Sequence, residues 1–454
     1  MEYEKNISLA SLKNISTFII NDYIDSIEPV FQNHDMPSNL LNTLPPNVTY
    51  LEVSGYIISQ NALNELGTLT KLNQLNFYKC NFKNNLKFDV LKNSKKLTTL
   101  KVDAFSQKLN GFPDSITSLT SLKNLDLYNQ NISTIPNSIS NLKNLEQLHL
   151  SDNKISTIPT TFGNLKNLKY LNLSNNRLSE IPDIFANLKN LQHLEINSNK
   201  LTSVNSKIGQ LTQLQNLYLI QNKITSIPSS IGNLTKLTDL NIGHNQIKTL
   251  PDTIGNLNKL STFFAYNNKL TSIPNSIGNL KNLQNLSFGE NNITAIPSSI
   301  GDSTKLKSLS LHKNEIRVIP ETIGKLKNLV ELYLYENKIM AIPESIGNLK
   351  KLEILNLSNN QITAFTNGLA KLENLTELDL FHNKINDTIP SHLSDIESLI
   401  IVDLRENVNI KGKTLTNPSL FVCLYNDERK NYSLCLDKNS TCIEENDKSL
   451  PVCA

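Results

Sequence analysis

The sequence predicts an α/β solenoid, in which short repeats stack to form a parallel β-sheet on one side and loops or 3-10 turns on the other. Two observations predict this class. An asparagine recurs every 23 residues through most of the chain. A short stretch of alternating apolar and polar residues precedes each of these asparagines, and this alternation is the period of a half-buried strand.

The recurring asparagine defines the repeat. Looser copies precede the regular series, with Tyr56, Cys80 and Gln130 at the asparagine position, and Asn407 follows it after a step of 24 residues. We count about 16 repeats, and such an array is one continuous architecture. The regular series consists of Asn153, Asn176, Asn199, Asn222, Asn245, Asn268, Asn291, Asn314, Asn337, Asn360 and Asn383.

The first half of each repeat is predicted to be a strand. In residues 145–150 (LEQLHL) the leucines face one side, while Gln147 and His149 face the other. The second half of the same repeat has apolar residues without a strand or helix period, so we expect a loop with a short 3-10 turn. Pro159 fits the start of this turn, because its φ is preset and its missing N–H is no loss there.

Two further positions predict how neighbouring repeats pack. The buried asparagine can pair backbone groups that strand pairing leaves free where the chain turns inward, so we expect a ladder of asparagine side chains. A glycine recurs late in the repeat, but Ser140, Ala186 and Ala370 replace it in three copies. These replacements indicate close packing rather than an obligatory positive φ.

The repeat L-x-x-L-x-L-x-x-N-x-I-x-x-I-P-x-x-I-G-N-L extends over residues 46–410 and resembles the leucine-rich-repeat family. The resemblance implies a curved horseshoe with a parallel concave sheet and a convex side of loops and 3-10 turns. The 23-residue form is similar to intracellular Ras-group proteins of the family. The late repeat NKINDTIPSHL (residues 383–393) is more like the 24-residue repeat of plant-type receptor ectodomains.

A solenoid exposes its core at both ends, and caps are needed there. We therefore expect an N-terminal cap in residues 1–45, the solenoid in residues 46–416, and a cysteine-containing C-terminal cap or tail in residues 417–454. Two repeats depart from the Ile-Pro pair, with Val204-Asn205 and Phe365-Thr366 in its place. These departures predict either neutral variation or a local kink or contact point.

Cys423, Cys435, Cys442 and Cys453 lie together near the C-terminus, in a polar region that could not build a core alone. Two disulfides, free thiols and a metal site are the alternatives. The spacing lacks the close cysteine pair and the neighbouring histidine of zinc sites, so we favour disulfides. Cysteine-paired caps are typical of the extracellular members of the family that the chain resembles. Disulfides imply an oxidising compartment, although the N-terminus is not a secretory signal as it stands. We favour an extracellular or cell-surface location, with a cytoplasmic one as the alternative.

The composition argues against several classes of function. The net charge is only +3 and no basic stripe occurs, so a nucleic-acid partner is not expected. No apolar run is long enough to span a membrane. The sequence contains no phosphate-binding loop, dinucleotide motif, nucleophile elbow or metalloprotease motif, and we expect neither an enzyme nor a cofactor.

Histidines recur along the repeats, and we interpret them as solvated side chains on a polar face. They are His149, His193, His244, His312 and His382.

The concave face is the candidate site, because the scaffold does not need its outward strand positions. Several of these positions carry large apolar side chains, which indicate a ligand-binding patch. The candidate residues are Tyr218, Ile220, His244, Phe264, Tyr266, His312, Tyr333, Tyr335 and Phe381.

The sequence favours a non-enzymatic scaffold that binds a protein or peptide on its concave face. Two alternatives remain open. One is a receptor-type ectodomain that senses a carbohydrate or another small ligand. The other is an intracellular signalling scaffold for a small GTPase, which the Ras-group resemblance implies.

Overall fold

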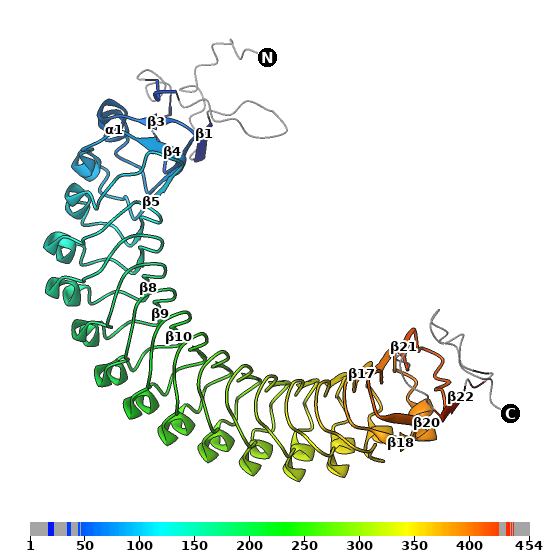
Figure 1. Ribbon diagram of the computed structural model, residues 1–454. Coiled ribbons are helices and arrows are strands. Elements are labelled where there is room, and N and C mark those ends of the chain that lie inside the picture. Colours follow the sequence, from blue (N-terminus) through cyan, green and yellow to red (C-terminus); the bar gives the residue numbers. More distant parts are fainter. Residues whose placement is uncertain are drawn as a thin grey trace, which may run out of the picture. The chain divides into compact units, whose positions relative to one another are not determined.

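The computed structural model describes residues 17–21, 34–37, 44–45, 47–425, 433–435, 437 and 439. The chain divides into two compact units, unit 1 (Met1–Asn222) and unit 2 (Lys223–Ala454). Within each unit, strands line the inner, concave side and turns line the outer side (Figure 1). Much of the two predicted end regions lies outside the described residues, so the cap boundaries stay predictions.

The inner side of unit 1 is a parallel sheet with one main strand per repeat. Successive strands pair in register, so Leu148 lies opposite Leu171, and Leu171 lies opposite Leu194. A short additional strand, β3 (Ile57–Ile58), pairs with the end of β4. The main strands are β1 (Thr17–Asn21), β2 (Tyr50–Ser54), β4 (Gln74–Phe82), β5 (Thr99–Ala104), β6 (Asn124–Asp126), β7 (Gln147–His149), β8 (Tyr170–Asn172), β9 (His193–Glu195) and β10 (Asn216–Tyr218).

Unit 2 continues the same pattern of parallel strands. A second, three-stranded parallel sheet arises where the repeat lengthens to 24 residues, and it consists of β18 (Asn386–Thr388), β20 (Asn409–Lys413) and β22 (Ser433–Cys435). The inner strands are β11 (Asp239–Asn241), β12 (Thr262–Phe264), β13 (Asn285–Ser287), β14 (Ser308–Ser310), β15 (Glu331–Tyr333), β16 (Ile354–Asn356), β17 (Glu377–Asp379), β19 (Ile401–Asp403) and β21 (Val422–Leu424). The predicted solenoid with a parallel inner sheet is confirmed within each unit.

The outer side consists mainly of short 3-10 helices, as predicted. In most repeats a proline stands directly before the turn, as Pro274 does with φ −65° and ψ 144°. The turns are η3 (Phe88–Asn93), η4 (Asp114–Ser118), η5 (Asn137–Asn141), η6 (Thr160–Asn164), η7 (Asp183–Asn187), η8 (Ser206–Gln210), η9 (Ser229–Asn233), η10 (Asp252–Asn256), η11 (Asn275–Asn279), η12 (Ser298–Asp302), η13 (Glu321–Lys325), η14 (Glu344–Asn348), η15 (Leu369–Lys371) and η16 (Ser391–Asp395).

One early repeat differs from this prediction. Its outer side is an α-helix, α1 (Gln60–Leu66). Ser59 caps this helix, because its hydroxyl accepts a hydrogen bond of 3.3 Å from the backbone N–H of Ala62. Ala62, Leu63 and Leu66 face the core and are buried. A serine before a helix satisfies one of the free N–H groups of its first turn, which stabilises this helix.

The asparagine ladder is confirmed, and Asn291 shows its geometry. The side-chain amide donates to the carbonyls of Ala265, Phe288 and Gly289 at 3.0 to 3.1 Å, and its oxygen accepts from the N–H of Leu270 at 2.9 Å. One buried side chain therefore satisfies four backbone groups from two adjacent repeats. The same kinds of bond recur along both units, at Asn176, Asn268, Asn314, Asn337, Asn360, Asn383 and Asn407.

Cys80 occupies the asparagine position with a thiol instead. Its sulfur lies 3.2 Å from the carbonyl oxygen of Val53 and is fully buried. Burial raises the pKa of the thiol to about 12. Cys80 therefore stays protonated and donates one hydrogen bond where asparagine would supply several.

The recurring glycine is explained by contact between turns. The φ angle of Gly278 is not in the left-handed region, but a Cβ atom there would lie 2.4 Å from the backbone oxygen of Ser299 in the next repeat. Substitution Gly278→Ala is therefore expected to destabilise the protein by about 1 kcal/mol or more, as overpacking does. Urea unfolding measures the effect. In the same turn, Ser276→Ala adds no atom and should be nearly neutral, and equal effects of the two changes would contradict the contact.

Candidate functional site

The inner strands present their alternate side chains as rows on one surface of each unit. Seven of the nine predicted site residues lie in unit 2, and six of these seven are half-buried, while His244 is exposed. Tyr218 and Ile220 lie in unit 1, where they are also half-buried, and the side-chain amide of Asn216 donates to the Tyr218 hydroxyl at 3.2 Å. The structure brings the seven residues of unit 2 onto one surface.

The first aromatic cluster of unit 2 forms around Tyr266, just after β12. Its ring meets His244 edge-on at 5.0 Å between centroids and lies 6.5 Å from the ring of Phe264. Gly243 makes room for it, because a Cβ atom there would come within 2.9 Å of the Tyr266 ring. The glycine at an outward position thus lets a large ring lie flat over its neighbour.

The second cluster forms just after β14 and β15. The rings of His312 and Tyr335 stack at 4.6 Å, and Gly289 leaves space for the histidine. The Ser310 hydroxyl lies 2.8 Å from Nδ1 of His312. Burial lowers the pKa of His312, partly opposed by Glu290, so the ring is neutral at neutral pH. His312 is therefore packed against tyrosine and not solvated as expected.

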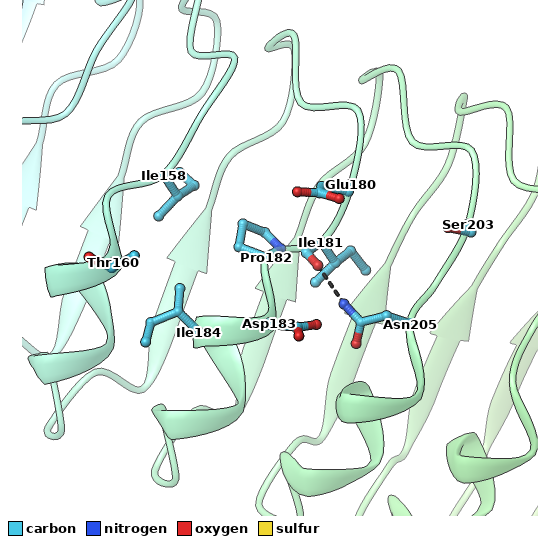
Figure 2. Close-up of a pocket in the computed structure, with 9 residues that line it drawn as sticks. All are labelled: Ile158, Thr160, Glu180, Ile181, Pro182, Asp183, Ile184, Ser203 and Asn205. Atoms are coloured by element: carbon cyan, nitrogen blue, oxygen red, sulfur yellow. Dashed lines mark hydrogen bonds between the residues drawn. The ribbon is translucent and has the colours of Figure 1, made fainter.

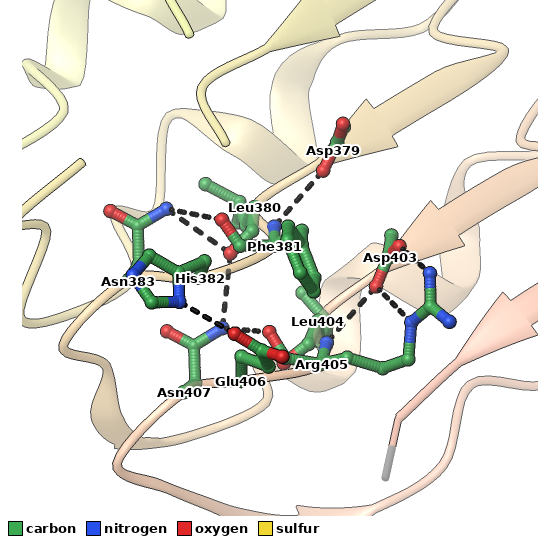
Figure 3. A network of polar contacts seen from close by, with 10 residues as sticks. All are labelled: Asp379, Leu380, Phe381, His382, Asn383, Asp403, Leu404, Arg405, Glu406 and Asn407. Carbon is green, nitrogen blue, oxygen red and sulfur yellow. Dashed lines mark hydrogen bonds and ion pairs between the residues drawn. The ribbon is translucent and has the colours of Figure 1, made fainter. Parts of the chain in front are cut away.

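The third cluster surrounds Phe381, near the C-terminal end of the inner sheet. The guanidinium of Arg405 lies 5.5 Å from the centre of the Phe381 ring, and it also pairs with Asp403 at 2.6 Å. Figure 3 shows these groups together with His382, whose ring lies 2.6 Å from the carboxylate of Glu406. The Arg405 guanidinium is thus already occupied by a carboxylate and a ring.

A row of smaller side chains separates the second and third clusters. Asn356 of β16 lies in register between Tyr333 of β15 and Asp379 of β17. Ser358 follows in the same repeat and donates to the oxygen of Asn356 at 2.7 Å. Asn356 and Ser358 therefore separate the two clusters, whereas Ile354, the other outward residue of β16, is apolar.

Carboxylates flank β16 on both neighbouring strands, and sequence analysis missed them. Glu331 and Glu377 flank Ile354 in register. Burial raises the pKa of Glu377, and the neighbouring Asp379 raises it further. The pKa of Asp379 is also raised by burial. Both shifts indicate carboxylates that lose hydration without gaining an adjacent cation. Asp379 occupies the same repeat position as Phe264 and Tyr333, and this equivalence was the available signal.

Sequence analysis also missed a ring cluster in unit 1. Tyr170 stacks on His149 at 4.5 Å, and its hydroxyl donates to Glu195 at 2.7 Å. Burial and the Glu195 carboxylate raise the pKa of Tyr170 to about 12, while burial lowers the pKa of His149. The interpretation of His149 as a solvated side chain was wrong, since the ring is half-buried against tyrosine.

The two departures from the Ile-Pro pair have structural roles on the outer side. The Asn205 side chain caps η8 by accepting from the N–H of Lys207 and donates to the carbonyl of Ile181 at 2.5 Å. A hollow of about 460 Å³ lies beside it, as Figure 2 shows. In the other repeat, the Thr366 hydroxyl donates to Glu344, and η15 shortens to three residues.

The described residues contain no group of three or more His, Cys, Asp or Glu side chains placed to hold a metal ion. Within the same part of the chain, no helix combines the length and the apolar character needed to cross a membrane. The inner surfaces present aromatic faces, carboxylates and a few hydrogen-bonding side chains.

Comparison with solved structures finds proteins of similar architecture. A leucine-rich-repeat protein of Leptospira interrogans, LIC12759, is 32% identical, with a TM-score of 0.70, over 77% of this chain and 87% of that one. The plant peptide hormone receptor RGFR1, in complex with RGF2, is 29% identical, with a TM-score of 0.73, over 91% of this chain and 66% of the receptor. The Arabidopsis receptor kinase HAESA, in complex with the peptide hormone IDA and the co-receptor SERK1, is 25% identical, with a TM-score of 0.64, over 89% and 73% of the two chains.

The comparison of sequences gives a consistent result. No curated protein matched the chain. The family model described as leucine-rich repeat region matches overlapping segments, residues 100–218, 162–242, 202–292 and 286–420. These segments cover well over half of the chain, and they coincide with the strands and turns described above. The chain therefore belongs to the leucine-rich-repeat family.

Proposed function

We propose that this protein is a non-enzymatic recognition protein that binds a peptide or protein ligand on the inner surface of unit 2. One observation carries the proposal. Large rings occupy outward strand positions, at Phe264, Tyr266, Tyr333 and Tyr335, where neighbouring repeats manage with serine or glycine. The fold does not require these rings, and half-buried aromatic side chains supply much contact area at low cost in conformational entropy.

The comparisons support a peptide ligand. RGFR1 is described as a peptide hormone receptor, and HAESA is described in complex with a peptide hormone. The chain spans 66% of the RGFR1 chain, so a receptor-like role for the whole protein is part of the proposal. β15, which carries Tyr333, and β17, which precedes Phe381, lie on either side of β16, so the stretch between them has a width of two strand spacings, about 10 Å. A single extended segment fits this width.

We also propose that the protein works outside the cell or at its surface, held at its C-terminal end by disulfides among Cys423, Cys435, Cys442 and Cys453. Two observations support this. Cys423 is fully buried on β21, and Cys80, far from the C-terminal cysteines in the sequence, is a free thiol. The side chains of the other three cysteines lie outside the described residues.

The cysteine proposal predicts a thiol count. Protein isolated without reductant is expected to show no reaction with a thiol reagent at the four C-terminal cysteines, because disulfide sulfurs carry no thiol. Cys80 should react only after denaturation, since it is buried with a raised pKa. Mass mapping of the labelled peptides identifies each site. Four reactive C-terminal thiols in the native protein would favour the cytoplasmic alternative.

The binding proposal is tested by selection of ligands on the intact chain. Wild-type protein is used to select binders from a displayed library of random peptides. Each binder is then titrated against variants in which the rings of unit 2 are removed. Binders whose affinity depends on these rings support the proposal, and a set of binders indifferent to all of them would overturn it.

A further inference from the structure

Unit 1 has a hollow of about 230 Å³ on its inner surface that is separate from the surface proposed above. It lies over β4, β5 and β6. Its walls include two tyrosines, Tyr78 and Tyr128, each 42% exposed, and its lining also includes Asp103. The fold does not require exposed tyrosines beside a carboxylate in a hollow, so this arrangement indicates a binding site.

The spacing of the strands sets the distance between the two rings. Asp103 is on β5, Tyr78 is on β4, and Tyr128 follows β6 by two residues. Since β4 and β6 both pair with β5, the backbone segments that carry the two tyrosines are about two strand spacings apart, roughly 10 Å. A group midway between the rings would lie about 5 Å from each. This is within the distance of about 6 Å at which a cation is attracted to an aromatic face.

The charges around the hollow favour a positive group. Burial raises the pKa of Asp103, and Asp126 also raises it, while Lys79 lowers it. The ammonium of Lys79 lies 5.3 Å from the centre of the Tyr78 ring, so this ring already attracts one cation. Lys101 also lines the hollow, but it lies in register beside Asp126, which offsets its charge.

A third carboxylate, Glu52, lines the hollow on the far side of Asn76. It accepts a hydrogen bond from the Tyr50 hydroxyl at 2.9 Å, which fixes it in place. The hollow therefore contains more carboxylates than ammonium groups, between two aromatic walls. A neutral apolar ligand would leave the excess negative charge uncompensated, whereas a cation compensates it.

We propose that this hollow binds an organic cation, an ammonium or a guanidinium group, between the rings of Tyr78 and Tyr128, with the carboxylate of Asp103 as its counter-charge. The site is independent of the peptide-binding surface of unit 2. The cation can belong to a small amine or to a lysine or arginine side chain, and these two sources share the same chemistry.

The test is a ligand-observed NMR titration of the full chain with two cations, choline and N-acetyl-arginine amide. The matched neutral probes are the tert-butyl analogue of choline and N-acetyl-citrulline amide, which have nearly the same shapes. Each hollow-binding cation is expected to bind at least about fivefold more tightly than its neutral analogue, as a cation–ring attraction of about 1 kcal/mol gives. Choline alone would identify a small amine, and the arginine amide alone a peptide side chain.

Variants locate the binding. Tyr128→Leu and Asp103→Asn are each expected to weaken binding of the cation at least about fivefold, whereas Tyr128→Phe, which keeps the ring, should retain most of it. Phe105→Leu removes another exposed ring of unit 1 outside the hollow and serves as the matched control. Circular dichroism verifies that each variant is folded. Equal binding of the cations and the neutral probes, or equal binding to wild type and Tyr128→Leu, would overturn the proposal, as would no binding of either cation.

Discussion

Substitution Asn291→Ala is expected to lower the free energy of unfolding by at least about 3 kcal/mol, the largest effect of any single change considered for this protein. The side chain pairs four backbone groups, the carbonyls of Ala265, Phe288 and Gly289 and the N–H of Leu270. Each of the four lost hydrogen bonds is worth about 0.5–1.5 kcal/mol, and the Leu270 N–H is left without an acceptor, which costs up to about 3 kcal/mol. The three carbonyls each keep a second donor, from Asn268, Asn314 or Asn267. Alanine removes all four bonds and cannot replace any of them.

The neighbouring residue provides a matched control. Asn292 is exposed, and its φ is not in the left-handed region. Its backbone N–H donates to the carbonyl of Leu270, and this hydrogen bond does not depend on the side chain. Asn292→Ala should therefore change stability by less than about 0.5 kcal/mol. Asn267 would be a poor control, because its side chain donates to Glu290 at 2.7 Å and its φ is 52°.

Hydrogen exchange distinguishes the ladder from general destabilisation. Urea unfolding measures the global effect, but a repeat array can open locally, so a single unfolding energy is incomplete. The amide of Leu270 should lose protection most in Asn291→Ala, since it loses its own acceptor. If Asn291→Ala and Asn292→Ala were equally stable, the ladder would have no energetic role.

Most of the fold could be predicted from the sequence because every repeat shows the same residues at the positions that determine its structure. The leucine alternation placed the strands, proline placed the 3-10 turns, and a glycine next to Ser299 of the following repeat explains the close packing. Each of these features depends on contacts between equivalent positions of adjacent repeats. When the same pattern occurs in many repeats, it therefore indicates which contacts between adjacent repeats the fold requires.

The loop after each strand was not predictable in the same way. One residue there adopts a positive φ in nearly every repeat, including Gln221, Lys313 and Glu336 at 51° to 55°. These residue types do not prefer that conformation, which asparagine, aspartate and glycine adopt more readily. The stacking of the repeats imposes it, so the local sequence carries little sign of it.

The candidate site was predictable only in part. Large side chains at outward strand positions were visible in the sequence, and the structure places seven of them on unit 2. Their partners were not visible, because the stacking of His312 on Tyr335 and the raised pKa of Asp379 depend on burial and on neighbours one or two repeats away. A regular repeat determines which residues share a surface, but it does not determine which of their side chains become buried and lose hydration.

Removal of two rings in the double variant Tyr266→Ala with Tyr333→Ala is expected to weaken binding of a ring-dependent peptide by at least about 2 kcal/mol, roughly 30-fold in Kd. The two rings lie on strands three apart, about 14 Å along the surface, so a single extended ligand can contact both. The change in melting temperature should be small. The repeat position of Tyr333 holds serine at Ser310, and that of Tyr266 holds glycine at Gly243 and Gly289, and the fold tolerates them.

Two control variants show whether this binding depends on the aromatic rings and on their place on the inner strands. The variant Tyr266→Phe with Tyr333→Phe keeps both rings and should retain most of the affinity, because ring contact outweighs the hydroxyls. The variant Val318→Ala with Met340→Ala removes exposed apolar side chains of unit 2 away from the inner strands, and it should bind as wild type does. Full affinity in the alanine double variant would mean that the ligand lies elsewhere, on the outer side or at the cysteine-bearing end. Lost affinity in the Val318 and Met340 variant would mean that the outer side of unit 2 takes part in binding.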